Sequence, residues 1–155
     1  MLNYSRVDGV SRDEQRAKRL MRSYARLQGS MAPVPTIVED LKTNELLFET
    51  LCVRDLRVFA EALDGKVYHY RDKSGLECDT VVHLRNGSYG LIEIKLGGEK
   101  LIQEGVDALT DLADKIDTTK MKKPSFMMVL TAVGQYAYKR PKDGVLVVPI
   151  GCLKD

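Results

Sequence analysis

The sequence has no apolar run of the roughly 18 residues that a membrane-spanning helix needs, and it does not open on a secretory signal peptide. It also has no internal repeat and no low-complexity tract. The formal net charge is only +2, so no overall electrostatic field marks a nucleic-acid binder. These absences predict a cytoplasmic protein without a membrane partner, in which any nucleic-acid surface is local.

Cysteine and histidine are both scarce. The cysteines Cys52, Cys78 and Cys152 are widely spaced and form no Cys-x-x-Cys pair. This spacing predicts reduced thiols that pack as small apolar groups. His69 and His83 have no second histidine at ligand spacing, so we expect both to occupy ordinary strand positions.

The chain has the composition of one ordinary globular domain, with 44% apolar and 30% charged residues among 155. Ser11 and Glu14 form a capping box that opens an amphipathic helix to about Gln28, and a Pro/Gly linker follows. We therefore expect an N-terminal helical appendage over residues 1–35 and the main domain over residues 36–155. A stripe of arginines on this helix either follows DNA phosphates or, as is commoner, forms a solvated face: Arg12, Arg16, Arg19, Arg22 and Arg26.

Hydrophobic periodicity and turn residues predict the order helix, three strands, helix, then two or three more strands in the main domain. The strand–helix–strand crossover implies some parallel pairing, because parallel neighbours need a long connection. The sequence therefore predicts an α/β fold with a mixed, α+β sheet flanked by helices. The expected elements are a helix over residues 44–63, strands over 66–71, 77–84 and 91–96, a helix over 99–117, and strands over 124–131, 136–140 and 145–150.

Two charged residues, Glu93 and Lys95, stand in a strand that otherwise reads as buried. Because side chains alternate along a strand, Ile92 and Ile94 point one way while Glu93 and Lys95 point the other. Charges that face a covered surface are costly unless they are paired or bind an ion. This pattern is the first indication of a functional site.

Asp79 meets Glu93 in only one of the two registers that the intervening hairpin allows. Asn86-Gly87 is a strong hairpin signal, and a two-residue turn there would pair Thr80 with Glu93. A three-residue loop, with Gly87 left-handed in a G1 bulge, instead pairs Asp79 directly with Glu93. We predict this second register.

Two carboxylates facing each other across a strand pair, with Cβ atoms roughly 5 Å apart, are destabilising unless a cation lies between them. Oxygen ligands favour a hard ion, so the expected cofactor is Mg²⁺ or Mn²⁺, completed by water and a phosphate. The competing interpretation is a structural ion pair of Lys95 with Asp79 or Glu93 that needs no metal.

This arrangement, with an acid on the second strand and Glu-x-Lys on the third, resembles the PD-(D/E)XK restriction-endonuclease-like superfamily. More specifically, residues 44–155 are similar to the C-terminal domain, labelled only as of unknown function, of predicted bacterial AAA+ ATPases. Residues 1–35 resemble the stretch that follows the ATPase core in that family. The segments that carry the closer resemblance are residues 47–51, 68–72, 74–79, 92–97 and 148–151.

The sequence departs from that family in two ways. It contains no GxxxxGK[ST] phosphate loop, so no ATPase activity is expected of this chain. The winged-helix-like stretch that usually precedes the nuclease-like part is also missing, because residues 36–46 join the linker to it directly. We therefore expect a shortened relative.

The resemblance implies a role for each residue of the candidate site. It implies that Asp79 and Glu93 bind the metal and that the backbone carbonyl of Ile94 contributes a ligand. It implies that Lys95 lies near the scissile phosphate and orients the attacking water or stabilises developing charge. Glu49 matches the additional acid of the superfamily, which reaches the metal directly or through water.

The expected function is therefore a Mg²⁺-dependent endodeoxyribonuclease-like domain that acts on DNA phosphodiesters as the C-terminal module of an AAA+ ATPase-type protein. The alternatives are an inactive module that binds DNA or protein or self-associates for such an ATPase, and a shortened relative with no present function. Tyr136, Tyr138, Lys139 and Arg140 mix aromatic and basic residues as nucleic-acid surfaces do, although alternation in an edge hairpin explains them almost as well.

Overall fold

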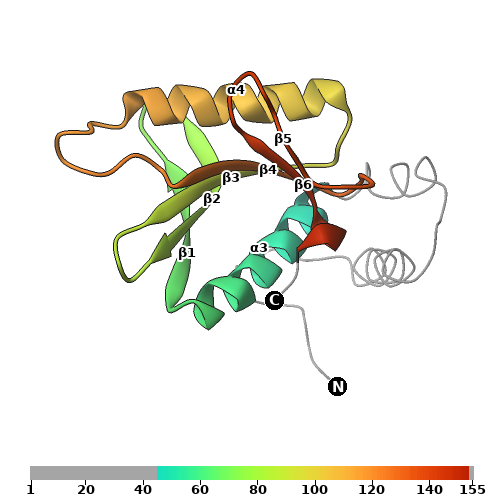
Figure 1. The fold of residues 1–155 in the computed structure, drawn as a ribbon, viewed down its shortest axis with the longest axis horizontal. Helices are drawn as coiled ribbons and strands as arrows, with labels where there is room; N and C mark the ends of the chain where they lie inside the picture. Colours follow the sequence, from blue (N-terminus) through green and yellow to red (C-terminus); the bar gives the residue numbers. More distant parts are fainter. Residues whose placement is uncertain (1–44, 154–155) are drawn as a thin grey trace.

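The computed structural model describes residues 45–153, and Figure 1 shows their fold as a mixed sheet between two helices. This confirms the predicted α+β architecture and the order helix, three strands, helix, strands. The predicted N-terminal helix, its linker and the arginine stripe lie outside the described residues. The elements are α3 (Glu45–Ala62), β1 (Gly65–Arg71), β2 (Glu77–Leu84), β3 (Tyr89–Lys95), α4 (Glu99–Lys115), β4 (Phe126–Thr131), β5 (Tyr138–Lys139), β6 (Leu146–Pro149) and the 3₁₀ turn η1 (Ile150–Cys152).

The sheet has the strand order β1-β2-β3-β4-β6-β5. β2 pairs antiparallel with β1 and β3, and β5 pairs antiparallel with β6. β3, β4 and β6 are parallel neighbours, and α4 makes the crossover from β3 to β4. The order puts β2 and β3 near one edge of the sheet, with β1 as the edge strand beside them.

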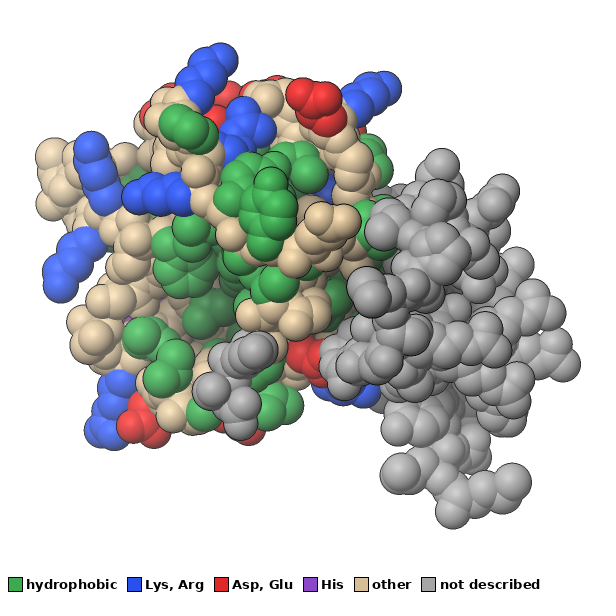
Figure 2. Space-filling model, turned by 45° about the vertical axis from the view of Figure 1, so that its right-hand side comes forward, with side chains coloured by type: hydrophobic (Ala, Val, Ile, Leu, Met, Phe, Trp, Pro, Cys, Tyr) green, Lys and Arg blue, Asp and Glu red, His purple; other side chains and the backbone are tan. Residues whose placement is uncertain are grey.

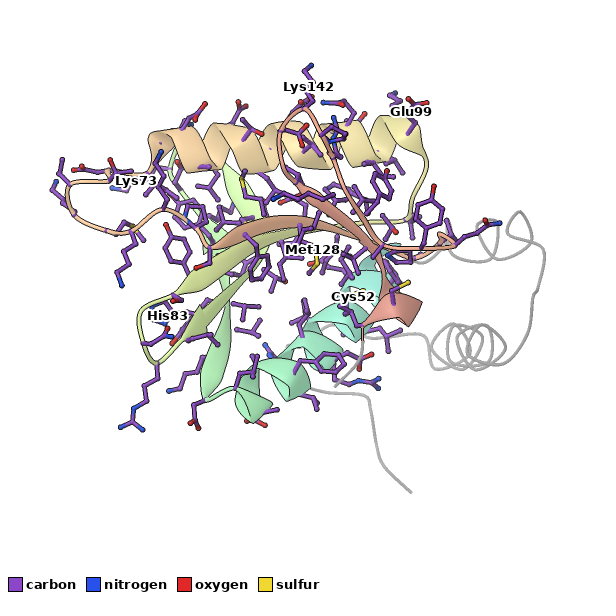
Figure 3. The ribbon with its side chains drawn as sticks, in the orientation of Figure 1. Cys52, Lys73, His83, Glu99, Met128 and Lys142 are labelled. Carbon is purple, nitrogen blue, oxygen red and sulfur yellow. The ribbon has the colours of Figure 1, made fainter. Side chains whose placement is uncertain are left out.

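The two helices cover opposite faces of the sheet, as Figure 1 shows. Alternation along the strands explains this division, because Ile92 and Ile94 pack in the core on the α3 side while Leu91 packs in the core on the α4 side. Figure 3 shows Met128 and Cys52 pointing into the space between the sheet and α3. Each fully buried aliphatic side chain stabilises the fold by about 1.5–3 kcal/mol. No helix among residues 45–153 is both long and apolar enough to cross a bilayer.

The β2–β3 hairpin has the three-residue loop that the sequence predicted. Leu84 N–H donates to Ser88 O at 2.8 Å, and Gly87 has the left-handed φ of 81° that a G1 bulge requires. The Cα pairing runs from His83 opposite Tyr89 to Thr80 opposite Ile92. One further step of the same register brings Asp79 opposite Glu93. The register prediction is therefore confirmed.

Candidate functional site

A second irregularity in β2 lies at the candidate site itself. Tyr68 on β1 faces Val81, and Tyr70 faces Cys78, so two steps along β1 correspond to three along β2. The extra residue of this β-bulge falls at Asp79–Thr80, where the backbone pairing of β2 with β3 also ends. Bulges of this kind redirect a side chain and commonly lie beside active sites. The bulge was not predicted from the sequence.

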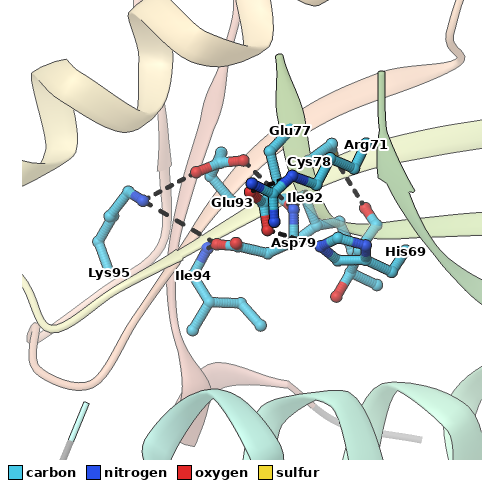
Figure 4. A network of polar contacts seen from close by, with 10 residues as sticks. His69, Arg71, Glu77, Cys78, Asp79, Ile92, Glu93, Ile94 and Lys95 are labelled. Carbon is cyan, nitrogen blue, oxygen red and sulfur yellow. Dashed lines mark hydrogen bonds and ion pairs between the residues drawn. The ribbon is translucent and has the colours of Figure 1, made fainter. Parts of the chain in front are cut away.

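Side chains of the site satisfy the backbone groups around the bulge (Figure 4). Ile94 N–H donates to Asp79 Oδ2 at 2.7 Å, and Asp79 N–H donates to Glu93 Oε1 at 3.3 Å. Cys78 Sγ donates to the carbonyls of Thr80 at 3.4 Å and Ile92 at 3.5 Å. Each acid is therefore bonded to the backbone of the other acid's strand, which fixes both carboxylates at the point where the strands separate.

Lys95 lies between the two acids. Its Nζ is 2.8 Å from Glu93 Oε2 and 4.0 Å from Asp79 Oδ2, and Figure 4 shows the ammonium group approaching both carboxylates. The Glu93 side chain is only 6% exposed, against 18% for Asp79 and 22% for Lys95. Burial raises the pKa of Glu93, the charge of Asp79 raises it further, and Lys95 opposes both. The ionised form of Glu93 therefore depends on a nearby positive charge.

A cavity of about 620 Å³ opens onto these residues. Its lining includes Phe48 and Glu49 from α3, and Ala108 and Asp111 from α4. Burial raises the pKa of Glu49, and the charge of Asp79 raises it further. Five acidic residues and one lysine line the cavity, which therefore favours a bound cation: Glu49, Glu77, Asp79, Glu93, Asp111 and Lys95.

Helix α4 closes over Glu93 and Lys95 because Gly105 has no side chain. A Cβ at this position would lie 3.4 Å from Glu93 Cβ, 3.4 Å from Lys95 Cγ and 3.2 Å from Val129 Cγ2. The contribution of α4 to the site was missed in the sequence. Small residues at Gly105 and Ala108, one helical turn apart, were the available signal.

His69 lies beside the site rather than at an isolated strand position. Its Nε2 is 2.9 Å from Oε1 of Glu77, a cavity residue, and Arg71 Nε lies 3.8 Å from Glu77 Oε2 (Figure 4). The positive charge that His69 carries when protonated lowers the pKa of Glu49. Arg71, and His69 when it is protonated, therefore offset the charge of one cavity acid, Glu77.

The donors at this site fit a hard divalent cation, because carboxylate oxygens of Asp79 and Glu93 face the cavity together. Within residues 45–153, no three acidic, histidine or cysteine side chains converge as a ligand set. Glu49 lines the same cavity without completing such a set with Asp79 and Glu93. The residues present would therefore supply two carboxylates to such an ion, and its other ligands would have to come from water or a phosphate.

The other predicted binding residues are not part of this cluster. Tyr138 and Lys139 form β5, at the edge of the sheet opposite β1. Arg140 is held by Asp143 Oδ2 at 2.9 Å and by Gln103 Oε1 at 2.8 Å. Arg12, Arg16 and Arg19 lie outside the described residues.

Comparisons with known proteins give one finding. A family model described as "Domain of unknown function (DUF4143)" matches residues 45–153. The match spans more than half of the chain and includes every residue of the cavity described above. No curated protein and no solved structure matches the chain.

Proposed function

The chain belongs to the DUF4143 family, and from its site we propose that it is a metal-dependent nuclease-like domain of the PD-(D/E)XK type. The proposed substrate is a DNA phosphodiester, and the proposed cofactor is Mg²⁺ or Mn²⁺. A larger ATPase-type protein is the proposed context of the domain.

One observation carries the proposal. Asp79 and Glu93, on the two strands of one hairpin, each accept a hydrogen bond from the other's strand and share Lys95 beside an acidic cavity. Carboxylates held this way are ready for a cation and cost little further ordering when it binds. The strand positions of the acids and of Glu-x-Lys are those that the superfamily resemblance implies.

Each side chain then has a separate task. Asp79 and Glu93 would hold the ion together with the Ile94 carbonyl, and Glu49 would contribute through water. When bound, the ion would make a coordinated water more acidic and would offset charge on the phosphate. Lys95 is partly exposed at the cavity, where its ammonium group would orient the phosphate and stabilise the charge that develops on it.

The electrostatics of the cavity make the proposed reaction strictly dependent on the metal. Without an added cation, the acidic lining repels a phosphate more strongly than Lys95 attracts it. We expect DNA cleavage in Mg²⁺ or Mn²⁺ and none in EDTA.

Plasmid nicking by the purified chain tests the proposal. We expect wild type to nick in Mg²⁺ and both Asp79→Asn and Lys95→Met to abolish nicking. Asp107→Asn and Lys100→Met, on the exposed surface of α4, are matched controls that should retain it. Calorimetric titration should show Mg²⁺ binding to wild type and Lys95→Met, and none to Asp79→Asn. Nicking that survives both site substitutions would refute the proposal.

A second function is favoured by the short contact between Lys95 and Glu93. At 2.8 Å, Lys95 neutralises Glu93 directly, so the cluster is also stable as a structural ion pair. In that case the domain is an inactive DNA- or protein-binding or self-association module of the ATPase-type protein. DNA binding without cleavage, unchanged by both site substitutions, would favour this function.

A further inference from the structure

The edge strand β1 presents two exposed tyrosines beside the site. Tyr68 is 53% exposed and Tyr70 38% exposed, and their spacing of two residues puts them on one face of the strand together with Lys66. Their partners on β2, Val81 and Cys78, pack in the core on the α4 side. The tyrosines therefore lie on the α4 side of the sheet, although α4 packs on β2, β3 and β4.

This face continues directly into the candidate site. Glu93 and Lys95 also lie on the α4 side, because both would contact a side chain at Gly105. Tyr70 is opposite Cys78, the residue before Asp79, and neighbouring strands are about 4.8 Å apart. A polynucleotide whose phosphate contacts Lys95 would therefore run along β1 if it extends from the cavity toward Tyr70.

The charge of β1 suits a polyanion. On the face that presents Tyr68 and Tyr70, the strand carries Lys66 and no acidic residue, whereas Arg71 lies on the opposite face, 3.8 Å from Glu77 Oε2. The flanking Asp72 is engaged in its own turn, where it accepts hydrogen bonds from Ser74 N–H at 2.8 Å and Leu76 N–H at 2.9 Å. Exposed aromatic rings with nearby positive charge are how proteins bind single strands, since every base has a face that can stack.

We propose that Tyr68 and Tyr70 stack against unpaired bases of single-stranded DNA next to the scissile phosphate, so that the substrate contains a single-stranded segment. This inference rests on the proposed nuclease function. It assigns single-strand binding to the β1 edge and not to the far edge, where Tyr136 and Tyr138 form a similar pair with ring centroids 6.0 Å apart. Figure 2 turns the side of β5 and β6 forward and shows hydrophobic side chains at its centre, with charged side chains of both signs around them.

The two tyrosine pairs allow a matched test with the full chain. Binding of a fluorescent oligo(dT) is measured by anisotropy in Ca²⁺, with gel electrophoresis to show that the probe stays intact. The variants are Tyr68→Ala/Tyr70→Ala, its conservative counterpart Tyr68→Phe/Tyr70→Phe, and the far-edge control Tyr136→Ala/Tyr138→Ala.

We expect wild type to bind oligo(dT) more tightly than a duplex of the same length. The β1 alanine pair should bind oligo(dT) at least about tenfold more weakly, because each lost stack costs about fivefold or more. The phenylalanine pair and the far-edge pair should bind within about twofold of wild type, since stacking on β1 is retained in both.

Equal binding by wild type and the β1 alanine pair, or a loss confined to the far-edge pair, would overturn the inference. Because the assay needs no turnover, it separates the two proposals. If the chain binds oligo(dT) through β1 but does not nick DNA, the single-strand surface is supported and the nuclease proposal is refuted. If wild type nicks DNA and the β1 alanine pair binds oligo(dT) as tightly as wild type, only the single-strand surface is refuted.

Discussion

Replacing Lys95 with methionine tests whether its charge keeps Glu93 ionised in the folded protein. With an effective dielectric constant of about 20, Coulomb's law gives about 6 kcal/mol of attraction at the 2.8 Å from Glu93 and about 4 kcal/mol at the 4.0 Å from Asp79. Desolvation of the three groups offsets most of this. Removing one partner of a buried pair typically costs 3–5 kcal/mol, and because Lys95 is 22% exposed we expect about 2–3 kcal/mol.

The loss should depend on pH. Burial and Asp79 raise the pKa of Glu93 above its ordinary 4.5, and Lys95 counteracts this. A carboxyl group with a raised folded-state pKa contributes stability that is fully present below its ordinary pKa and is lost as pH rises through the folded value. Without Lys95 the folded-state pKa rises further, so Lys95→Met should lose more stability at pH 8 than at pH 5.

Urea denaturation at both pH values provides the assay, with Glu93→Gln and the double variant Glu93→Gln/Lys95→Met completing a mutant cycle. We expect a coupling of about 2 kcal/mol at pH 8 and a clearly smaller one at pH 5. Lys100→Met removes an exposed ion pair and should leave stability nearly unchanged. Equal stability of wild type and Lys95→Met at pH 8 would refute this account of the charge balance.

Two further predictions concern helix α4, which packs against Glu93 and Lys95, and the protonation of Glu93. Gly105→Val should lower the free energy of unfolding by about 1–3 kcal/mol and reduce nicking, because the added side chain forces α4 away from Glu93 and Lys95. Gly151→Ala is the control, because Gly151 has open space around it. Equal urea midpoints for wild type and Gly105→Val would contradict the close approach of α4. The affinity for Mg²⁺ should fall as pH drops through the raised pKa of Glu93, since the ligand binds ionised. Calorimetry from pH 5 to pH 8 measures this, and an affinity independent of pH would argue against Glu93 as a ligand.

The bulge at Asp79–Thr80 lowers the stability of the fold at this site. The Thr80 hydroxyl is buried without a hydrogen-bond partner, a condition that typically costs about 1–3 kcal/mol. The same irregularity ends the backbone pairing of β2 with β3 and releases the N–H groups that Asp79 and Glu93 bind. Such departures from regular pairing are expected where function requires a particular side-chain direction.

Local patterns in the sequence were sufficient to predict the elements and one register. The alternation around Glu93 predicted which side chains face the covered surface, and Asn86-Gly87 predicted the hairpin. The predicted helix over residues 99–117 and strand over 77–84 correspond to Glu99–Lys115 and Glu77–Leu84. The strand predicted over 136–140 is shorter, because the structure has it only at Tyr138–Lys139.

The sequence by itself determined where helices and strands form and that two acids and a lysine share a strand pair, because side-chain period and turn chemistry are local properties. Only the tertiary structure decided the bulge at Asp79, the approach of α4 at Gly105 and the place of β1 beside the site. These features depend on contacts between segments distant in sequence, which packing determines and which no local pattern encodes.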